Sequence, residues 1–581
     1  MVKVDLLRNE YPRPQMVRDN WQNLNGVWDF QFDFGASGEE RKLYLTENFY
    51  GGDVKKINVP FCPESKLSGI EYKDFMSAVL YCRKFTFGKE IENKRVILHF
   101  GAVDYEAKVW VNDQFAGSHK GGYSSFSFDI TALVQEGENT LSLWVKDDLR
   151  SGRQPHGKQS RPYYSKMCDY SRTTGIWQTV WTELVPMEYV KAYKVYPNIH
   201  DSSAKIDVTA VASNGAEVTA TASFGGKVVG KASAKVSGGL ASMILKLDEL
   251  HLWDVGQPNL YDLELTLGED KLSCYFGMRS VEIKPDALYL NGRPFFMRLI
   301  LDQGFNPEGI YTYPSEEYLK RDIELSMELG FNGARLHERV FEERTLYWAD
   351  KLGYVVWGEY ANNNDQFNGN GVPDFLPEWM ETMDRDFNHP SIIGWCINNE
   401  SYWMTAVDSC NQETIYDVTK RLDPTRPVID ASGGVHFKTD MFDVHDYTAD
   451  PVKFAEKLAP MLEDPKKFHN PIHQEQLQRN VYEGQPYWIS EYGGIKWGGT
   501  GWGYGGQVAD FDAFVRRYVG CTKVLLDHAR ICGFCYTQLT DVEQETNGLY
   551  TYDREKKFPQ EVYDAIREIN TAPAYIEQNN K

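Results

Sequence analysis

Hydrophobic and polar residues alternate along most of the first half of the chain. Stretches with an apolar residue at every second position recur across residues 25–285, separated by turns rich in Gly, Asn, Asp and Ser. Examples are 95–114, 139–147, 204–213, 218–224 and 261–268. A period of two is typical of strands with one buried face, so the pattern predicts antiparallel β-sandwiches.

A change in residue usage divides this β region. Strands rich in Trp and Tyr give way, near residues 187–200, to strands rich in Ala, Ser and Val. We therefore expect two β domains. The first is a jelly-roll β-sandwich over residues 1–187, and the second is a smaller immunoglobulin-like β-sandwich over residues 188–284.

From residue 285 onward, strands alternate with helices. One helix is predicted between Ser315, as its N-cap, and Gly330, with apolar residues at four-residue spacing between them. Strand candidates follow in the order 295–301, 333–337, 354–359, 391–397, 427–432, 442–447, 486–491 and 531–539. Eight strands with helices between them predict a catalytic (β/α)8 TIM barrel over residues 285–581.

Composition and charge narrow the class of protein. The chain has 581 residues, of which 42% are hydrophobic and 25% are charged, as in soluble globular proteins with several domains. A net charge of -21 disfavours nucleic-acid and anionic-membrane partners, which require a basic face. No apolar run approaches the roughly 20 residues of a spanning helix. The first residues lack a signal-peptide pattern, so a cytoplasmic location is expected unless such a peptide has been removed.

Two predicted barrel strands end on a glutamate. The stretch HPSIIGWCINNESYW places Glu400 after the apolar run of the fourth strand, and QPYWISEYGG places Glu491 at the end of the seventh. The carboxyl ends of barrel strands line the active site, so both carboxylates are expected to face one pocket. Two facing carboxylates are what glycoside hydrolysis requires, although a glutamate at a strand end also serves as an ion-pair partner.

Other polar and aromatic residues are candidates for substrate binding. Those at predicted strand ends are Asp302, Arg335, His337, His445 and Tyr447, and those in the Gly-rich segment after the seventh strand are Trp497 and Trp502. A position in the core or at the rim is the alternative for each of them.

Two motifs point to other chemistries. Gly501, Gly503 and Gly506 form a G-x-G-x-x-G, but no βαβ unit precedes them, so an active-site loop is preferred to a dinucleotide site. Cys532 and Cys535 form a single C-x-x-C without the second pair that a zinc site needs, so no metal is expected. A non-catalytic carbohydrate-binding protein is a further alternative, and the sequence leaves open whether the chain forms a homo-oligomer.

Longer motifs run through nearly the whole chain. They include PRPQMVRDNWQNLNGVWDFQFD, TGIWQTVWTELVP, LYWADKLGYVVWGE, HPSIIGWCINNES, WISEYGG and GFCYTQLTDVEQETNGLYTYDR. In this order they resemble glycoside hydrolase family 2, the family of β-galactosidases, β-glucuronidases and β-mannosidases. The resemblance implies a sugar-binding jelly roll, an immunoglobulin-like sandwich and a catalytic barrel that acts on a carbohydrate without a cofactor.

The resemblance also implies roles for single residues. Glu400 matches the general acid/base of the family, Asn399 its neighbour that binds the sugar 2-hydroxyl, and Glu491 the nucleophile. Tyr536 stands where β-galactosidases and β-glucuronidases often have a Trp platform for the sugar. These roles imply a retaining, exo-acting enzyme with about 5–5.5 Å between the two carboxyl groups.

The prediction of the sugar rests on a missing residue. β-Glucuronidases of the family resemble one another in an Asn-x-Lys motif whose Lys meets the uronate carboxylate, whereas here Glu545 and Asn547 stand at those positions. A uronate facing Glu545 would suffer like-charge repulsion, although Arg554, Lys556 and Lys557 follow shortly and offer cations. A neutral sugar is therefore expected, with a β-galactoside first. An arabinoside, a galactofuranoside, a mannoside and a glucuronide are the alternatives.

Overall fold

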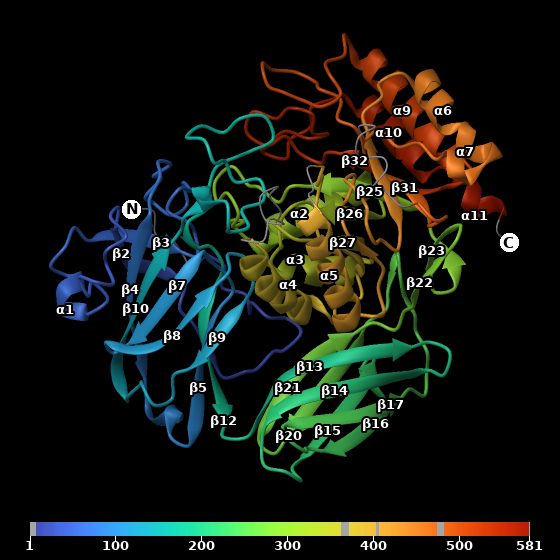
Figure 1. Ribbon diagram of the computed structural model, residues 1–581. Coiled ribbons are helices and arrows are strands. Elements are labelled where there is room, and N and C mark those ends of the chain that lie inside the picture. The colour runs from blue at the N-terminus through green and yellow to red at the C-terminus, as the bar shows by residue number, and fades with distance from the viewer. Residues whose placement is uncertain (1–6, 362–370, 403–405, 473–481, 580–581) are drawn as a thin grey trace.

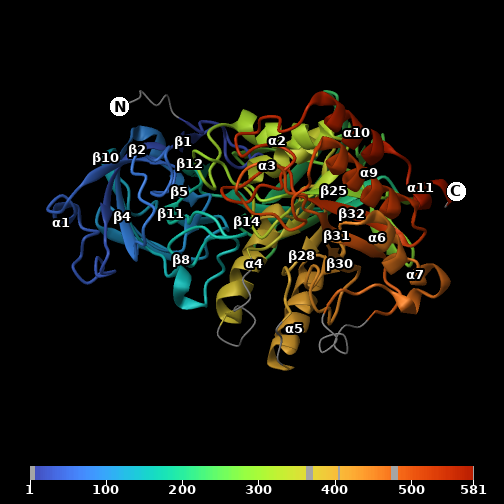
Figure 2. The same cartoon turned by 90° about the horizontal axis from the view of Figure 1, so that it is seen from above.

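The computed structural model describes residues 7–361, 371–402, 406–472 and 482–579. It contains two β-sandwiches, drawn in blue to cyan and in green in Figure 1, and a barrel with surrounding helices, drawn in olive to red. Figure 2, seen from above, shows the first sandwich beside the barrel on the side of α4 (Val372–Asp386). Hydrogen bonds from the backbone of Tyr123 and Ser124 to Glu378 of α4 join the two bodies.

The first sandwich has a six-stranded and a four-stranded sheet. In spatial order the larger sheet is β3 (Lys55–Val59), β2 (Gly26–Phe32), β4 (Ala78–Phe87), β10 (Gly137–Lys146), β7 (Glu106–Val111) and β8 (Gln114–Lys120), and the smaller is β1 (Trp21–Asn23), β12 (Val180–Pro186), β5 (Lys94–Phe100) and β9 (Phe126–Asp129). A short pair, β6 (Val103–Asp104) and β11 (Gly175–Ile176), adjoins them. Side chains such as Trp28, Tyr81 and Leu143 fill the core between the sheets, which gives the predicted jelly-roll sandwich.

The second sandwich shows the predicted alternation most clearly. Its sheets are β13 (Tyr189–Asn198), β14 (Ser203–Val211) and β17 (Leu240–Lys246) on one side, and β16 (Lys227–Lys235), β15 (Glu217–Phe224), β20 (Tyr261–Leu267) and β21 (Asp270–Phe276) on the other. In β17, Ala241, Met243 and Leu245 are buried while the residues between them are exposed. This period of two buries one face of the sheet, as an immunoglobulin-like sandwich requires.

The barrel contains all eight predicted strands. Its parallel sheet runs in the order β29 (Val428–Ile429), β28 (Ile392–Cys396), β27 (Val355–Glu359), β26 (Gly333–Leu336), β25 (Met297–Asp302), β32 (Ile531–Thr537), β31 (Tyr487–Gly493) and β30 (Phe442–Asp446). Strands such as β28 and β32 are buried along their whole length, because helices cover their outer side. The jelly-roll, immunoglobulin-like and TIM-barrel fold is therefore confirmed.

The described helices of the barrel alternate with these strands. Besides α4, the longer ones are α2 (Glu316–Glu328), α3 (Glu343–Leu352), α5 (Ala406–Leu422), α6 (Pro451–Leu458), α9 (Phe511–Asp527) and α10 (Gln560–Thr571). The predicted helix is α2, with Ser315 at the N-cap position and Gly330 just beyond its end at a φ of +80°. The Ser315 side chain makes no capping hydrogen bond. No helix in the described part of the chain is both long and apolar enough to cross a membrane.

In the described residues, the backbone hydrogen bonds between barrel strands are interrupted between β29 and β30, and side chains bridge this gap. His436 lies between these strands with Nδ1 2.7 Å from Oδ1 of Asp430 and Nε2 2.9 Å from the carbonyl oxygen of Asp443. Burial lowers the pKa of His436, but the two aspartates outweigh it and raise the pKa to about 9. The imidazolium therefore holds the two strand ends together.

Replacing His436 with Asn is expected to destabilise the barrel by about 3 kcal/mol at pH 6, since the pKa rises from 6.5 to about 9 on folding. A raised pKa gives stability that is complete below 6.5 and is lost as the pH rises through about 9. Urea unfolding of both proteins between pH 6 and pH 10 should show the difference shrinking. The exposed His200, replaced by Asn, is the control. A difference that stays constant over this range would contradict the expectation.

Candidate active site

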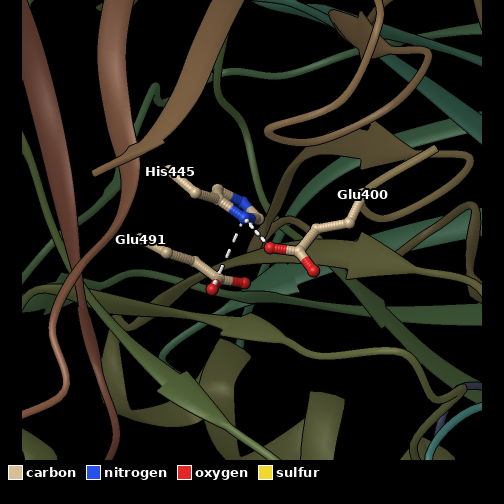
Figure 3. A group of neighbouring side chains, drawn as sticks. All are labelled: Glu400, His445 and Glu491. Atoms are coloured by element: carbon tan, nitrogen blue, oxygen red, sulfur yellow. Dashed lines mark hydrogen bonds and ion pairs between the residues drawn. The ribbon is translucent and has the colours of Figure 1, made fainter. Parts of the chain in front are cut away.

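Two carboxylates and one imidazole meet at the carboxyl ends of the barrel strands (Figure 3). Glu491 lies in β31, and Glu400 follows β28 in a left-handed conformation with a φ of +47°, which is uncommon outside glycine. His445 of β30 lies between them. Its Nδ1 is 2.7 Å from Oε1 of Glu400 and 3.5 Å from Oε2 of Glu491.

The two carboxylates are close enough to act on the same bond. One oxygen of Glu400, one oxygen of Glu491 and the His445 nitrogen all lie within 4.8 Å of one another. The side chain of Glu400 is 33% exposed and that of Glu491 is 4% exposed, so the pair has one open and one enclosed member. The same three atoms could also coordinate a metal ion. However, Nδ1 of His445 and Oε1 of Glu400 are at hydrogen-bonding distance, where a proton lies between them.

Donors on two sides hold Glu491. Nη1 of Arg335 donates to its Oε1 at 3.1 Å, and the Tyr447 hydroxyl donates to its Oε2 at 2.5 Å. Arg335 is almost completely buried and also donates to Glu359 at 2.5 Å and to Oδ1 of Asn399 at 3.2 Å. Both oxygens of Glu491 thus accept hydrogen bonds, which fixes the orientation of the carboxyl group.

Glu400 and His445 share a proton. Burial alone would raise the pKa of Glu400, but the hydrogen bond and charge of His445 lower it to about 2. Burial would lower the pKa of His445, but Glu491 and Glu400 raise it above its usual value. The proton therefore resides on His445, and the pair as a whole holds the proton that a general acid must deliver.

Glu359, which ends β27, was not among the residues predicted from the sequence. Its Oε2 lies 3.2 Å from Nδ1 of His337, and its Oε1 accepts from Arg335. Burial raises its pKa, but Arg335 and His337 together lower it to about 2. The signal was present, because Glu359 ends an apolar strand candidate in the same way as the two predicted glutamates.

Lys158 and Glu338 were also missed. Nζ of Lys158, from the jelly-roll domain, lies 3.5 Å from Oε1 of Glu338, which follows β26. Glu338 also accepts a hydrogen bond from Nδ2 of Asn399 at 2.8 Å. The charges of Glu338, Glu400 and Glu491 raise the pKa of Lys158 in spite of its burial. No local pattern marks this contact, because its partners lie in different domains.

Asp302 is not brought to the carboxylates. In the pairing of β25 with β26, Leu301 lies beside Arg335 and Asp302 beside Leu336. Neighbours in register point to the same side of a sheet, so Arg335 faces the barrel interior and Asp302 faces the helices. There, burial and the nearby charge of Asp322 raise its pKa to about 7.

The two predicted tryptophans, Trp497 and Trp502, have different surroundings. Trp497 packs on Phe511 with ring centroids 4.6 Å apart. Trp502 contacts Tyr504 at 4.3 Å, and Tyr504 stacks on Tyr447 at 4.8 Å, so Trp502 lies two ring contacts from Glu491.

Tyr536 occupies the barrel core and offers no platform to a sugar. It is fully buried, and its ring packs against Tyr492 and Tyr518 with centroids 5.5 and 4.8 Å away. Its hydroxyl accepts a hydrogen bond from the backbone of Ile495 at 3.4 Å.

The side chain of Glu545 is not accessible to a substrate. The residue is fully buried, and its Oε2 accepts a hydrogen bond from the Tyr170 hydroxyl of the jelly-roll domain at 2.6 Å. Burial raises its pKa to about 7. The three cations that follow it are engaged elsewhere: Arg554 with Asp322, Lys556 with Gln560, and Lys557 with Asp541. The repulsion on which the prediction of a neutral sugar rested is therefore absent from this structure.

The G-x-G-x-x-G segment and the C-x-x-C motif both belong to the packed structure of the barrel. The backbone of Trp502, within the Gly-rich segment, exchanges hydrogen bonds of 2.8 Å with Gln544 and Thr546, so this segment is a loop paired with another loop rather than a strand-to-helix turn. Cys532 and Cys535 are fully buried and free within β32.

Comparisons with known proteins agree with this organisation. Three family models match the chain: Glycosyl hydrolases family 2, sugar binding domain, over residues 63–181; Glycosyl hydrolases family 2 over 188–279; and Glycosyl hydrolases family 2, TIM barrel domain, over 281–518. Together they span most of the chain in the order of the three domains.

Curated relatives and solved structures give the same picture. A beta-glucuronidase from Felis catus is 25% identical over 458 residues, which cover 72% of this chain and 69% of that protein. A beta-galactosidase from Thermoanaerobacter pseudethanolicus is 27% identical over 441 residues, which cover 72% of this chain and 54% of that protein. The structure of a beta-glucuronidase from an uncultured Clostridium sp. has a TM-score of 0.78 at 22% identity, covering 95% of this chain and 98% of that one. From its three matched domains and its paired glutamates, this chain is a glycoside hydrolase that belongs to family 2.

Proposed function

We propose that this chain is a retaining, exo-acting β-glycosidase. The observation that carries the proposal is the pair Glu400 and Glu491, in which one oxygen of each carboxylate lies within 4.8 Å of one oxygen of the other. Retaining enzymes hold their carboxyl groups about 5–5.5 Å apart, whereas inverting enzymes leave roughly 6.5–9.5 Å for a water molecule. The short separation supports direct attack by one carboxylate on the sugar.

The roles follow from the surroundings of each glutamate. Glu491 is enclosed and held by Arg335 and Tyr447, which suits a nucleophile that attacks the anomeric carbon. Glu400 is the more exposed and shares a proton with His445, which suits proton delivery to the leaving oxygen. In the second half of the reaction, Glu400 takes a proton from the water molecule that releases the sugar from Glu491.

For the sugar, we favour a β-glucuronide. The expectation of a neutral sugar rested on an anionic Glu545 facing the substrate, and this residue is buried against Tyr170. Beta-glucuronidases among the relatives of this chain support the same choice. A β-galactoside is the second candidate, because beta-galactosidases match at similar identity and because Glu338 adds a further carboxylate near the catalytic pair.

A panel of nitrophenyl glycosides tests both parts of the proposal. The anomer formed first, followed by NMR, should have the configuration of the substrate, and the opposite configuration would contradict the retaining mechanism. The specificity constant should be larger for the β-glucuronide than for the β-galactoside. The reverse order would leave the mechanism in place and overturn the choice of sugar.

A further inference from the structure

Lys158 is a buried cation that the first domain inserts into the active site of the barrel. It lies in the segment between β10 and β11, and its side chain is 9% exposed. Gly157 makes the close approach possible: with a φ of +54°, a Cβ at this position would lie 2.3 Å from the carbonyl oxygen of Glu338. Gln159 anchors the other side by donating to Oδ2 of Asp104 at 2.8 Å.

The ammonium group of Lys158 has hydrogen-bond donors that no described residue accepts. Among the described residues, its one ion-pair partner is Glu338, at 3.5 Å, and none accepts a hydrogen bond from Nζ. An ammonium carries three donors, so Nζ can donate to a group that binds next to it. Arg335, by contrast, donates hydrogen bonds to Glu359, Glu491 and Asn399.

The position of Lys158 fits a group on the bound sugar. Glu400 and Glu491 are close enough to raise its pKa, and its own charge is close enough to lower the pKa of Glu545. Lys158 is thus close to the pair Glu400 and Glu491 and also to Glu545, which stands at the Asn position of the Asn-x-Lys motif.

We propose that Lys158 binds the carboxylate of a terminal uronic acid, so that the jelly-roll loop and the barrel share substrate recognition. The inference rests on the proposed glycosidase function of this site. An ammonium–carboxylate hydrogen bond is roughly twice as strong as a neutral one, so a uronate gains more from Lys158 than the hydroxymethyl group of a neutral sugar does.

The test compares two substrates that differ only in the oxidation of C6, nitrophenyl β-glucuronide and nitrophenyl β-glucoside. Lys158→Met keeps the length of the side chain without its charge. It should lower kcat/KM for the glucuronide by about 30- to 1000-fold, chiefly through KM, and that for the glucoside by less than about 3-fold. Lys158→Arg should retain part of the preference for the glucuronide.

Equal losses on both substrates would overturn the proposal, because Lys158 would then serve only the catalytic carboxylates. No loss on the glucuronide, or a wild-type preference for the neutral sugar, would overturn it as well. Failure of the proposed function looks different: no activated glycoside is turned over and no fluorosugar labels Glu491. Calorimetry with glucuronate and glucose needs no turnover, and equal affinity of the wild type and Lys158→Met for glucuronate would also overturn the proposal.

Glu338 provides the matched control. If Lys158 only neutralises this carboxylate, the double variant Lys158→Met/Glu338→Gln should recover the activity on the glucuronide that Lys158→Met has lost. If Lys158 binds the substrate, the double variant should stay impaired on the glucuronide. Glu338→Gln alone should keep the preference for the glucuronide, because the ammonium is then free for the sugar. Thermal melts of all variants show whether each is folded.

Discussion

Replacing Glu491 with Gln is expected to abolish turnover, with a loss in kcat of at least roughly 10⁴-fold on every substrate. The amide keeps the size of the side chain, but its single oxygen can accept from only one of Arg335 and Tyr447, and it cannot form the covalent glycosyl intermediate. The measurements are steady-state kinetics on an activated glycoside and mass spectrometry after incubation with a fluorosugar. The wild type should gain the mass of the sugar and the variant should not.

A control variant separates this effect from a general loss of fold. Glu463→Gln, at a side chain that is 78% exposed, should leave turnover unchanged. If Glu491→Gln still forms the covalent adduct, another residue is the nucleophile and the proposed mechanism is wrong.

Replacing Glu400 with Gln is expected to slow the hydrolysis of glycosides with poor leaving groups by about 10²- to 10⁴-fold. Substrates whose leaving groups need no proton should form the covalent intermediate at nearly the wild-type rate, because only the help of the acid is lost. The intermediate then accumulates, since water is no longer activated, and added azide should release it as a glycosyl azide. Stopped-flow measurement of the burst and product analysis check both points.

Loss of the burst with an activated substrate would show that Glu400 does more than transfer a proton. The structure offers one reason to look for this outcome. His445 joins Glu400 to Glu491, so a change at Glu400 can also move the charge and position of the nucleophile.

The positions of Glu400 and Glu491 at the ends of barrel strands could be predicted because their signal is local. An apolar run followed at once by a carboxylate marks the end of a buried strand, and in a barrel such ends meet at one face. The same reasoning placed Arg335, His337, His445 and Tyr447 at strand ends, and in the structure each of the four lies within 4.0 Å of Glu400 or Glu491.

The predictions for Asp302 and Tyr536 were wrong because the strand-end pattern does not show which face of a strand a residue occupies. A strand has two faces, and a shift of one residue exchanges them, so Asp302 turns to the helices although it too ends a strand. Tyr536 was expected at a sugar platform, yet packing within the barrel buries its ring against Tyr492 and Tyr518. Which side of a strand faces the site depends on register and packing, which neighbouring strands decide together.

The sequence by itself determined the three domains, the eight barrel strands and the two glutamates, because periodicity and strand ends are properties of short segments. Only the tertiary structure decided that Lys158 enters the site, that Glu545 is sheltered by Tyr170, and that His445 joins the two carboxylates. The first two are contacts between domains and the third joins separate barrel strands, so each depends on how distant segments pack. Burial then sets the charge and the free hydrogen-bonding capacity of each group, and these decide which sugar the site can hold.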